Sequence, residues 1–322
     1  MKRISLGSTG LSVSRIAFGT WQLSGQWGTF DEDRAISAIR EARELDINFF
    51  DTAQAYGFGA SERMLGKALR KEITADRDSV VIATKGGVLP EGGRDASAGY
   101  LRQGVEQSLR SLGVETIDLY QVHWPDPEVP AAETAGALQE LVDEGKIRFA
   151  GVSNYDVQQM AEFAAVRPVD TLQPPYHLFR RGIEAEVLPY TIEHGIGVLA
   201  YSPLASGLLT GRFDENTTFE ESDWRSQSSA FTGDTLKRNL AVVRRLADFA
   251  EGRGLTVSQL AIAWVLARPG VDVAIVGARS SANIRASAAA ADVEFSPEDL
   301  SRIDDLAADA VSVEGATPEG VT

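Results

Sequence analysis

The feature that most constrains this chain is a regular alternation of short apolar runs with longer amphipathic stretches. Eight runs are predicted to be strands: Ile16–Gly19, Asn48–Asp51, Val80–Lys85, Ile117–His123, Arg148–Val152, Asp170–Gln173, Gly197–Ser202 and Asp272–Val276. Runs such as VVIAT and VLAYS are almost continuously apolar, which is typical of parallel strands covered on both faces. The stretches between them, such as Asp31–Leu45, place apolar residues every three or four positions and are predicted to be helices.

Eight strand–helix pairs in 322 residues fit a (β/α)8 TIM barrel, an α/β fold of about 250 residues plus insertions. A doubly wound open sheet shows the same alternation and is the competing topology. The first predicted strand runs into FGTWQLSG, which lacks the GxGxxG loop of the dinucleotide-binding form of that sheet. We therefore predict a single barrel domain over residues 1–322.

Three segments interrupt the alternation. The first 15 residues, with GSTG between RISL and LSVS, are predicted to form a β-hairpin ahead of the barrel. Residues 203–235 form a long loop after the seventh strand, and loops of this length usually have a function, often as a lid. The tail, residues 311–322, has little to bury and is expected to be irregular.

Composition excludes several classes of partner. The chain has 31 Lys and Arg against 46 Asp and Glu, a net charge of −15, so it repels nucleic acids and anionic membrane surfaces. It has no cysteine, hence no disulfide and no thiolate metal site. It shows neither a signal-peptide core nor an apolar run near the ~20 residues that span a bilayer. We expect a cytoplasmic protein, a monomer or small homo-oligomer, that acts on a small molecule.

The histidines do not suggest a metal site. His123, His177 and His194 are scattered, and neither HxH nor HExxH occurs. His177, in PPYHLF, is expected to pack or hydrogen-bond near the sixth strand, and His194 to end a helix before Gly195. Without metal ligands or a GxSxG nucleophile elbow, a barrel hydrolase is disfavoured.

Polar side chains gather where three neighbouring predicted strands end. The second strand ends in Asp51, with Tyr56 five residues later, the third ends in Lys85 and the fourth in His123. Any one of them could be a solvated loop residue, a structural ion pair or an ordinary rim histidine. Catalytic groups of a barrel lie at the carboxyl ends of its strands, so the four together indicate a catalytic pocket.

Four segments carry a family resemblance: DTAQAYGFGASERMLGKAL, VVIATKGG, DLYQVHWPDP and GKIRFAGVSNYD resemble the aldo-keto reductase superfamily, from the first strand to about residue 290. The resemblance implies a barrel that reduces carbonyls with a nicotinamide dinucleotide, and a catalytic tetrad of Asp51, Tyr56, Lys85 and His123. A free tyrosine, of pKa about 10, is a poor acid–base group at neutral pH, and the Lys85 ammonium favours its phenolate. Asp51 would hold Lys85, and His123 would orient the carbonyl oxygen.

The resemblance also implies a binding site for NADP(H), with NAD(H) as an alternative. By resemblance, Ser153, Asn154 and Gln173 hydrogen-bond the nicotinamide carboxamide, Tyr201 stacks on its ring, and Ser202–Arg212 folds over the pyrophosphate. The predicted cofactor-binding residues are Thr20, Trp21, Asp51, Ser153, Asn154, Gln173, Tyr201, Ser202, Pro203, Leu204, Ser206, Gly207, Arg212, Gly277, Arg279, Asn283 and Ser287.

The adenosine end departs from the family pattern. Arg279, near a predicted helix start, is suited to the 2′-phosphate because Arg grips phosphate bidentately. The family pattern continues with Gln and then Glu-Asn, whereas this chain has Asn283 and then Ala286 and Ser287. We expect weaker contacts to adenine and a less strict preference for NADP(H).

The predicted substrate pocket is aromatic-walled and mainly apolar, which suits aldehydes, ketones, quinone-like carbonyls or sugar-derived aldehydes. Its predicted residues are Trp21, Tyr56, His123, Trp124 and Trp224.

An alternative of another class is a cofactor-binding regulatory protein similar to the β-subunits of voltage-gated potassium channels, with weak or vestigial reductase activity. Such proteins keep the tetrad and the cofactor loop, so these motifs do not separate the two functions. The short stretch ahead of the barrel favours the enzyme, and a channel-binding test discriminates between them.

Overall fold

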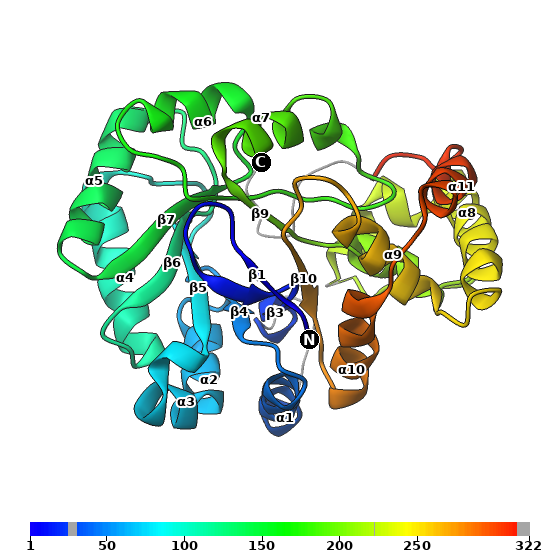
Figure 1. Cartoon of the computed structure of the whole chain (residues 1–322), viewed down its shortest axis with the longest axis horizontal. Coiled ribbons are helices and arrows are strands. Elements are labelled where there is room, and N and C mark those ends of the chain that lie inside the picture. The colour runs from blue at the N-terminus through cyan, green and yellow to red at the C-terminus, as the bar shows by residue number, and fades with distance from the viewer. Residues whose placement is uncertain (25–30, 222, 314–322) are drawn as a thin grey trace.

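The computed structural model describes residues 1–24, 31–221 and 223–313, and it shows the predicted (β/α)8 barrel (Figure 1). Eight parallel strands close on themselves in the order β10-β3-β4-β5-β6-β7-β8-β9. Their bounds are β3 Ile16–Gly19, β4 Phe49–Asp51, β5 Val81–Gly86, β6 Ile117–Val122, β7 Ile147–Ser153, β8 Thr171–Gln173, β9 Gly197–Ala200 and β10 Val273–Gly277. The closed register brings the carboxyl ends of all eight strands to one end of the molecule.

Helices form the outer layer. They are α1 Glu32–Glu44, α2 Ala60–Ala68, α3 Arg70–Ala75, α4 Ala98–Leu112, α5 Ala131–Asp143, α6 Val157–Ala164, α7 Val187–His194, α8 Gly233–Glu251, α9 Val257–Leu266, α10 Ser281–Ala288 and α11 Pro297–Ala307. Helix α1 shows why they form: Asp31 caps its first turn by accepting from the Arg34 N–H, and Ala35, Ile39 and Ala42 are buried along one stripe.

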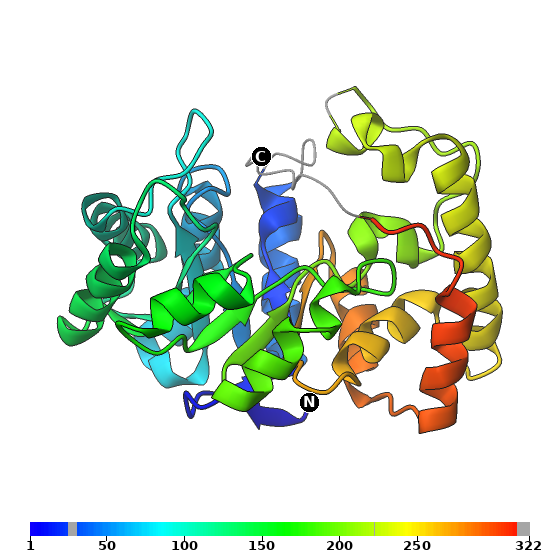
Figure 2. The same ribbon diagram turned by 90° about the horizontal axis from the view of Figure 1, so that it is seen from above.

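The predicted N-terminal hairpin closes one end of the barrel. Strands β1 (Arg3–Ser5) and β2 (Ser12–Ser14) pair antiparallel, and the hairpin lies at the lower end of the barrel in Figure 2. Its Leu6, Leu11 and Val13 are buried in one apolar cluster with side chains of the barrel strands. This end of the barrel is therefore packed, and a site has room at the opposite, carboxyl end.

The predicted long loop follows β9 and contains short 3-10 helices at Ala205–Thr210, Trp224–Gln227 and Ser229–Phe231. Aromatic rings hold it together: Phe219 lies edge-on to Phe213 at 5.4 Å and to Phe231 at 5.6 Å between ring centroids.

The chain's described C-terminal residues, 311–313, are in neither a helix nor a strand. The Val313 N–H donates to the Phe179 carbonyl, and buried Asn239 bonds both the N–H and the carbonyl of Val311. The rest of the predicted irregular tail, 314–322, lies outside the described residues.

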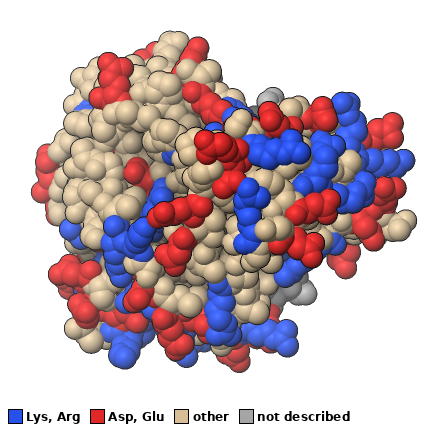
Figure 3. Space-filling view, turned by 45° about the vertical axis from the view of Figure 1, so that its right-hand side comes forward, with Lys and Arg blue, Asp and Glu red and all other residues tan. Residues whose placement is uncertain are grey.

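Charges of both signs are interspersed on the face shown in Figure 3. Among the described residues, no helix has the length and apolarity needed to cross a membrane.

Candidate active site

A buried ion pair lies at the carboxyl end of the barrel. The Lys85 ammonium on β5 donates to Asp51 Oδ1 at 2.7 Å and to the Thr52 carbonyl at 2.8 Å. The other carboxylate oxygen, Asp51 Oδ2, accepts from Gln173 Nε2 at 2.9 Å. Asp51 and Lys85 are almost fully buried, so each needs the other: an unpaired charge in this position would be strongly destabilising.

Tyr56 and His123 complete the predicted tetrad around this pair. The Lys85 ammonium lies 5.2 Å from the centre of the Tyr56 ring, on its face. The His123 ring meets the Tyr56 ring edge-on, with centroids 5.8 Å apart. The Trp21 ring stacks against the Tyr56 ring, with 6.4 Å between the two centroids. The structure thus brings together the four residues that the sequence pattern places at the ends of adjacent strands.

A second hydrogen-bonded group lies beside the tetrad, at the ends of β6 to β9. Asn154 Nδ2 donates to the His123 carbonyl at 3.0 Å and to Ser153 Oγ at 3.1 Å, and the Tyr201 hydroxyl donates to Asn154 Oδ1 at 2.9 Å. Asn154 has a φ of 63°, a left-handed conformation that Asn tolerates better than most residues. Ser153 Oγ in turn donates to the Gln173 carbonyl at 2.8 Å. These hydrogen bonds fix the orientation of the amide and hydroxyl groups.

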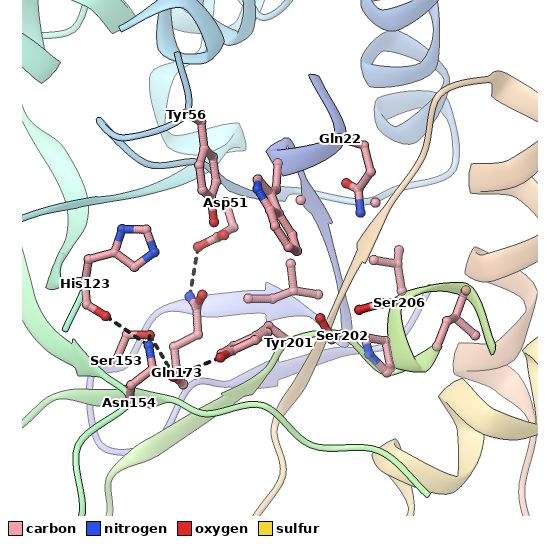
Figure 4. A pocket seen from close by; sticks show the side chains of 18 of the residues that line it. Gln22, Asp51, Tyr56, His123, Ser153, Asn154, Gln173, Tyr201, Ser202 and Ser206 are labelled. Carbon is pink, nitrogen blue, oxygen red and sulfur yellow. Dashed lines mark hydrogen bonds between the residues drawn. The ribbon is translucent and has the colours of Figure 1, made fainter. Parts of the chain in front are cut away.

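These groups open onto a cavity of about 990 Å³, a volume that includes open solvent at its mouth. The lining residues are Gly19, Trp21, Gln22, Asp51, Tyr56, His123, Ser153, Asn154, Gln173, Tyr201, Ser202, Pro203, Leu204, Ser206, Gly207, Thr210, Arg225, Ile275, Val276 and Gly277. In Figure 4, Tyr56, His123 and Asn154 lie at one end of the cavity, and Gln22 and Ser206 at the other. The two ends differ in chemistry: the first carries Asp51, Tyr56 and His123 with the amides of Asn154 and Gln173, and the second carries the Gln22 amide, hydroxyls and the Arg225 guanidinium.

The backbone is unusual at the second end. Ser202, Ala205 and Ser206 have φ values of 56°, 48° and 53°, in the left-handed region that favours glycine. Each such residue costs on the order of 1–3 kcal/mol, and such conformations cluster at ligand-binding sites. Successive left- and right-handed residues also turn backbone N–H groups to one side, an arrangement that suits anions.

Some predicted cofactor residues lie outside the cavity lining. Thr20 is buried beside it, with its hydroxyl donating to the Asp51 carbonyl. Arg212 is exposed and donates to Asn283 Oδ1 at 3.3 Å, at the start of α10, and Ser287 is buried on the same helix. Arg279 is exposed; partial desolvation and then the nearby Arg225 guanidinium lower its pKa.

Two predicted aromatic residues also lie away from the cavity lining. Trp124 packs against Ala55 and Val88, with the Arg94 guanidinium 5.4 Å from the centre of its ring. Trp224 lies edge-on to Phe231 at 5.5 Å, within the aromatic cluster of the long loop. Both remain predicted substrate-pocket residues.

Outside the predicted segment Ser202–Arg212, sequence reasoning missed two polar residues of the lining, Gln22 and Arg225. Arg225 is paired with Asp223 at 2.6 Å, donates to the Ser206 carbonyl at 3.2 Å, and lies over the Phe219 ring. Nothing in the sequence of a long loop indicates which of its charges faces a cavity. Gln22 could have been found, because it directly follows Trp21 at the end of a strand.

The other two histidines have structural roles, as predicted. His177 is buried, accepts from the Phe179 N–H at Nδ1, and has its pKa lowered to about 3 by burial and then by Arg180. His194 is the last residue of α7, before Gly195 with a φ of 65°. Within residues 1–24, 31–221 and 223–313, no group of three or more His, Cys, Asp or Glu is placed to hold a metal ion.

Comparison with known proteins gives the family. The sequence model of the Aldo/keto reductase family matches residues 15–308. The chain belongs to this family. Aldo-keto reductases are oxidoreductases that use NADP(H) or NAD(H), as predicted from the resemblance.

Three relatives illustrate the range of this family. Aldo-keto reductase YhdN of Bacillus subtilis (strain 168) is 44% identical over 291 residues, 89% of this chain and 87% of that protein. The NADH-specific methylglyoxal reductase of Escherichia coli (strain K12) is 33% identical, over 95% of this chain and 98% of that protein. The structure of the glycerol dehydrogenase AKR11B4 from Gluconobacter oxydans matches with a TM-score of 0.88 and 38% identity, covering 98% of each chain.

Proposed function

We propose that this aldo-keto reductase is an NADP(H)-dependent enzyme that reduces aldehydes or ketones to alcohols, with Tyr56 as the general acid. The observation that carries the proposal is the buried Asp51–Lys85 pair beneath the Tyr56 ring, with His123 at the ring edge. A phenol and an imidazole in the cavity wall, with a buried ammonium behind the phenol, are the groups that carbonyl reduction needs.

The cavity residues fit a nicotinamide dinucleotide. The acceptor oxygen Gln22 Oε1 is buried in the wall without a donor among the described residues, so it can accept from a hydroxyl or amide of a bound group. The amides of Asn154 and Gln173 at one end suit a carboxamide, and the backbone around Ser206 with Arg225 at the other suits a phosphate. When bound, this cofactor supplies the hydride.

The remaining steps belong to the protein. Tyr56 donates its phenolic proton to the oxygen of the carbonyl as negative charge develops there. The Lys85 ammonium, 5.2 Å from the Tyr56 ring, stabilises the phenolate that is left. Asp51 holds the Lys85 side chain in place, and His123 donates a hydrogen bond that orients the carbonyl oxygen.

Preference for NADP(H) is a separate part of the proposal, because one relative is named as NADH-specific. Two guanidiniums support it: Arg225 lines the cavity, and Arg279 lies close enough for the two charges to interact. Two cations beside each other favour a phosphate between or next to them. We assign Arg279 to the 2′-phosphate.

The test is a spectrophotometric screen at 340 nm with NADPH and NADH against a panel of aldehydes, ketones and quinones. We expect turnover of at least one carbonyl class, and faster turnover with NADPH. Tight binding of NADPH with no turnover of any carbonyl would favour the regulatory alternative, which a channel-binding assay then checks.

A further inference from the structure

Helix α2 begins with two buried polar residues that neither the proposed chemistry nor the cavity lining uses. Ser61 and Glu62 are 1% and 0% exposed, on the face of the first turn that packs against the barrel. Burying a serine and a carboxyl in this layer costs free energy unless each is hydrogen-bonded. Their partners therefore indicate what they do.

Ser61 hydrogen-bonds to three segments around the tetrad: the residue after β3, the residue after β4 and the loop that carries Tyr56. Its N–H donates to the Tyr56 carbonyl at 3.2 Å, and its hydroxyl donates to Thr20 Oγ1 at 2.7 Å. The same hydroxyl accepts from Thr52 Oγ1 at 3.1 Å. Thr52 is the residue whose carbonyl accepts from the Lys85 ammonium. One serine thus contacts the ends of β3 and β4 and the loop that carries Tyr56.

Glu62 makes the equivalent contact to β5. Its Oε1 accepts from Thr84 Oγ1 at 2.7 Å. Thr84 directly precedes Lys85, and side chains alternate along a strand, so Thr84 points to the helices while Lys85 points into the barrel. The Glu62–Thr84 bond therefore fixes β5 from behind at the position of the ammonium.

The surroundings of Glu62 favour its neutral form. Burial raises the pKa of its carboxyl, opposed by the nearby hydroxyls of Ser108 on α4 and Thr84 on β5 and by the charge of Arg63 on its own helix. The other carboxyl oxygen, Glu62 Oε2, is buried with no hydrogen-bond partner among the described residues. Tyr120 on β6 also faces it, and burial raises the pKa of that phenol as well. A neutral acid can keep the Thr84 bond without the cost of a buried charge.

We propose that Ser61 and Glu62 are positioning residues, which hold Tyr56 and Lys85 in register at the ends of β4 and β5. The inference rests on the proposed function, since it takes Tyr56 and Lys85 as the groups to be positioned. A shift of about 1 Å at a reacting group can reduce the rate by about a hundredfold. Loss of one of these bonds therefore lowers kcat without removing any group that touches substrate or cofactor.

The experiment compares Thr84→Val with Thr134→Val. Both remove one buried threonine hydroxyl bond; that of Thr134 goes to the Ala96 carbonyl, away from the cavity lining. We expect Thr84→Val to lower kcat by roughly tenfold to a hundredfold, with the Kd for NADPH by fluorescence titration within about twofold. Thr134→Val should leave both values within about twofold.

A readout independent of turnover is the ionisation of Tyr56, measured as the absorbance at 295 nm during a pH titration. The titration of each variant is compared with that of the same variant also carrying Tyr56→Phe, and the difference is the signal of Tyr56. Displacement of Lys85 moves this transition to higher pH in Thr84→Val and not in Thr134→Val. Equal kcat and equal Tyr56 transitions in the two folded variants would overturn the positioning role.

Glu62 itself is tested with Glu62→Gln and Glu62→Leu. Gln is neutral and can accept from Thr84, so Glu62→Gln should keep kcat within about threefold while Glu62→Leu loses about tenfold or more. Where Glu62→Leu fails to fold, Glu62→Gln still decides: a large loss of kcat in this variant contradicts a neutral positioning residue. If Tyr56→Phe keeps more than a tenth of wild-type kcat, the proposed function fails. If Tyr56→Phe falls below a tenth and Thr84→Val matches Thr134→Val, only the positioning inference fails.

Discussion

The two ends of the cavity are built on different principles. At the tetrad end, Asp51, Lys85 and Gln173 come from strands far apart in the sequence, and each is nearly inaccessible to solvent. At the other end, Asp223 and Arg225 are two residues apart in a loop and keep only 17% and 16% of their side chains exposed, whereas Arg279 is exposed. Removing one partner of the buried pair held by separate strands costs several kcal/mol, whereas the interactions of a solvent-exposed cation such as Arg279 contribute roughly 0–1 kcal/mol.

This difference indicates at which end of the cavity a substitution is tolerated. At the tetrad end, replacing Asp51, Lys85 or Gln173 leaves a buried charge or hydrogen-bonding group without its partner. The loop end can exchange cations and hydroxyls at small cost, so cofactor preference is the property that relatives can vary. One relative, 33% identical to this chain, is named as NADH-specific.

The largest effect is expected from Tyr56→Phe at the tetrad end. Loss of the proton donor should lower kcat by about 10²- to 10⁴-fold, while the Kd for NADPH is unchanged because other residues hold the cofactor. Steady-state rates on a good aldehyde and fluorescence titration measure the two. Tyr190→Phe, which removes a phenol from α7, is the control and should leave both unchanged. More than a tenth of wild-type kcat in Tyr56→Phe would contradict the assignment.

Lys85→Met should lower kcat almost as much, because the phenolate loses its neighbouring charge and Asp51 loses its partner. If stabilisation of the phenolate is the whole role, the deficit shrinks as pH rises toward the ordinary range of tyrosine, near pH 10. A pH–rate profile from pH 6 to 10 measures it. A deficit that is the same at every pH indicates that the ammonium mainly holds the strands together.

A smaller effect is expected at the loop end. Arg279→Ala should raise KM for NADPH by about tenfold and leave KM for NADH within twofold, because only NADPH carries the 2′-phosphate. Arg285→Ala is a matched control on α10, where the guanidinium pairs with Glu41 instead. Equal increases for both cofactors would move Arg279 from the 2′-phosphate to a group that the cofactors share.

The smallest effect is expected from Ser287→Asn, which restores the amide of the family pattern. If α10 holds the adenine, both cofactors should bind about two- to fivefold more tightly, since adenine is common to them. Fluorescence titration with NADPH and NADH measures the change. Tightening of one cofactor alone, or of neither, would show that the adenine lies elsewhere.

The same contrast explains what the sequence can predict. Strand ends are set by apolar periodicity, so the pattern alone places Asp51, Lys85 and Gln173 at the carboxyl ends of strands, and the barrel with its hairpin is confirmed. The bounds of the strands are less predictable. The pattern predicts the seventh strand over Gly197–Ser202, whereas β9 ends at Ala200 because the chain turns at Ser202 with a φ of 56°.

Loop contacts cannot be predicted in this way. Arg225 faces the cavity because Phe219, Asp223 and the Ser206 carbonyl surround its guanidinium, and all four lie in the segment that has no apolar period. Helix α3 (Arg70–Ala75) is also absent from the sequence-based prediction, since none of its residues is buried and it therefore carries no apolar stripe.

One hydrogen bond gives the tetrad a mechanical role in the barrel. In the closed order β10-β3-β4-β5-β6-β7-β8-β9, the strands β4 and β8 face each other across a diameter, and the bond from Gln173 to Asp51 joins them. Any flattening or widening of the barrel along this diameter stretches or compresses that bond and pulls on the carboxylate that holds Lys85. The cross-section of the barrel and the electrostatic field at Tyr56 are therefore coupled, and a distant change that deforms the cylinder reaches the reacting groups through a single amide.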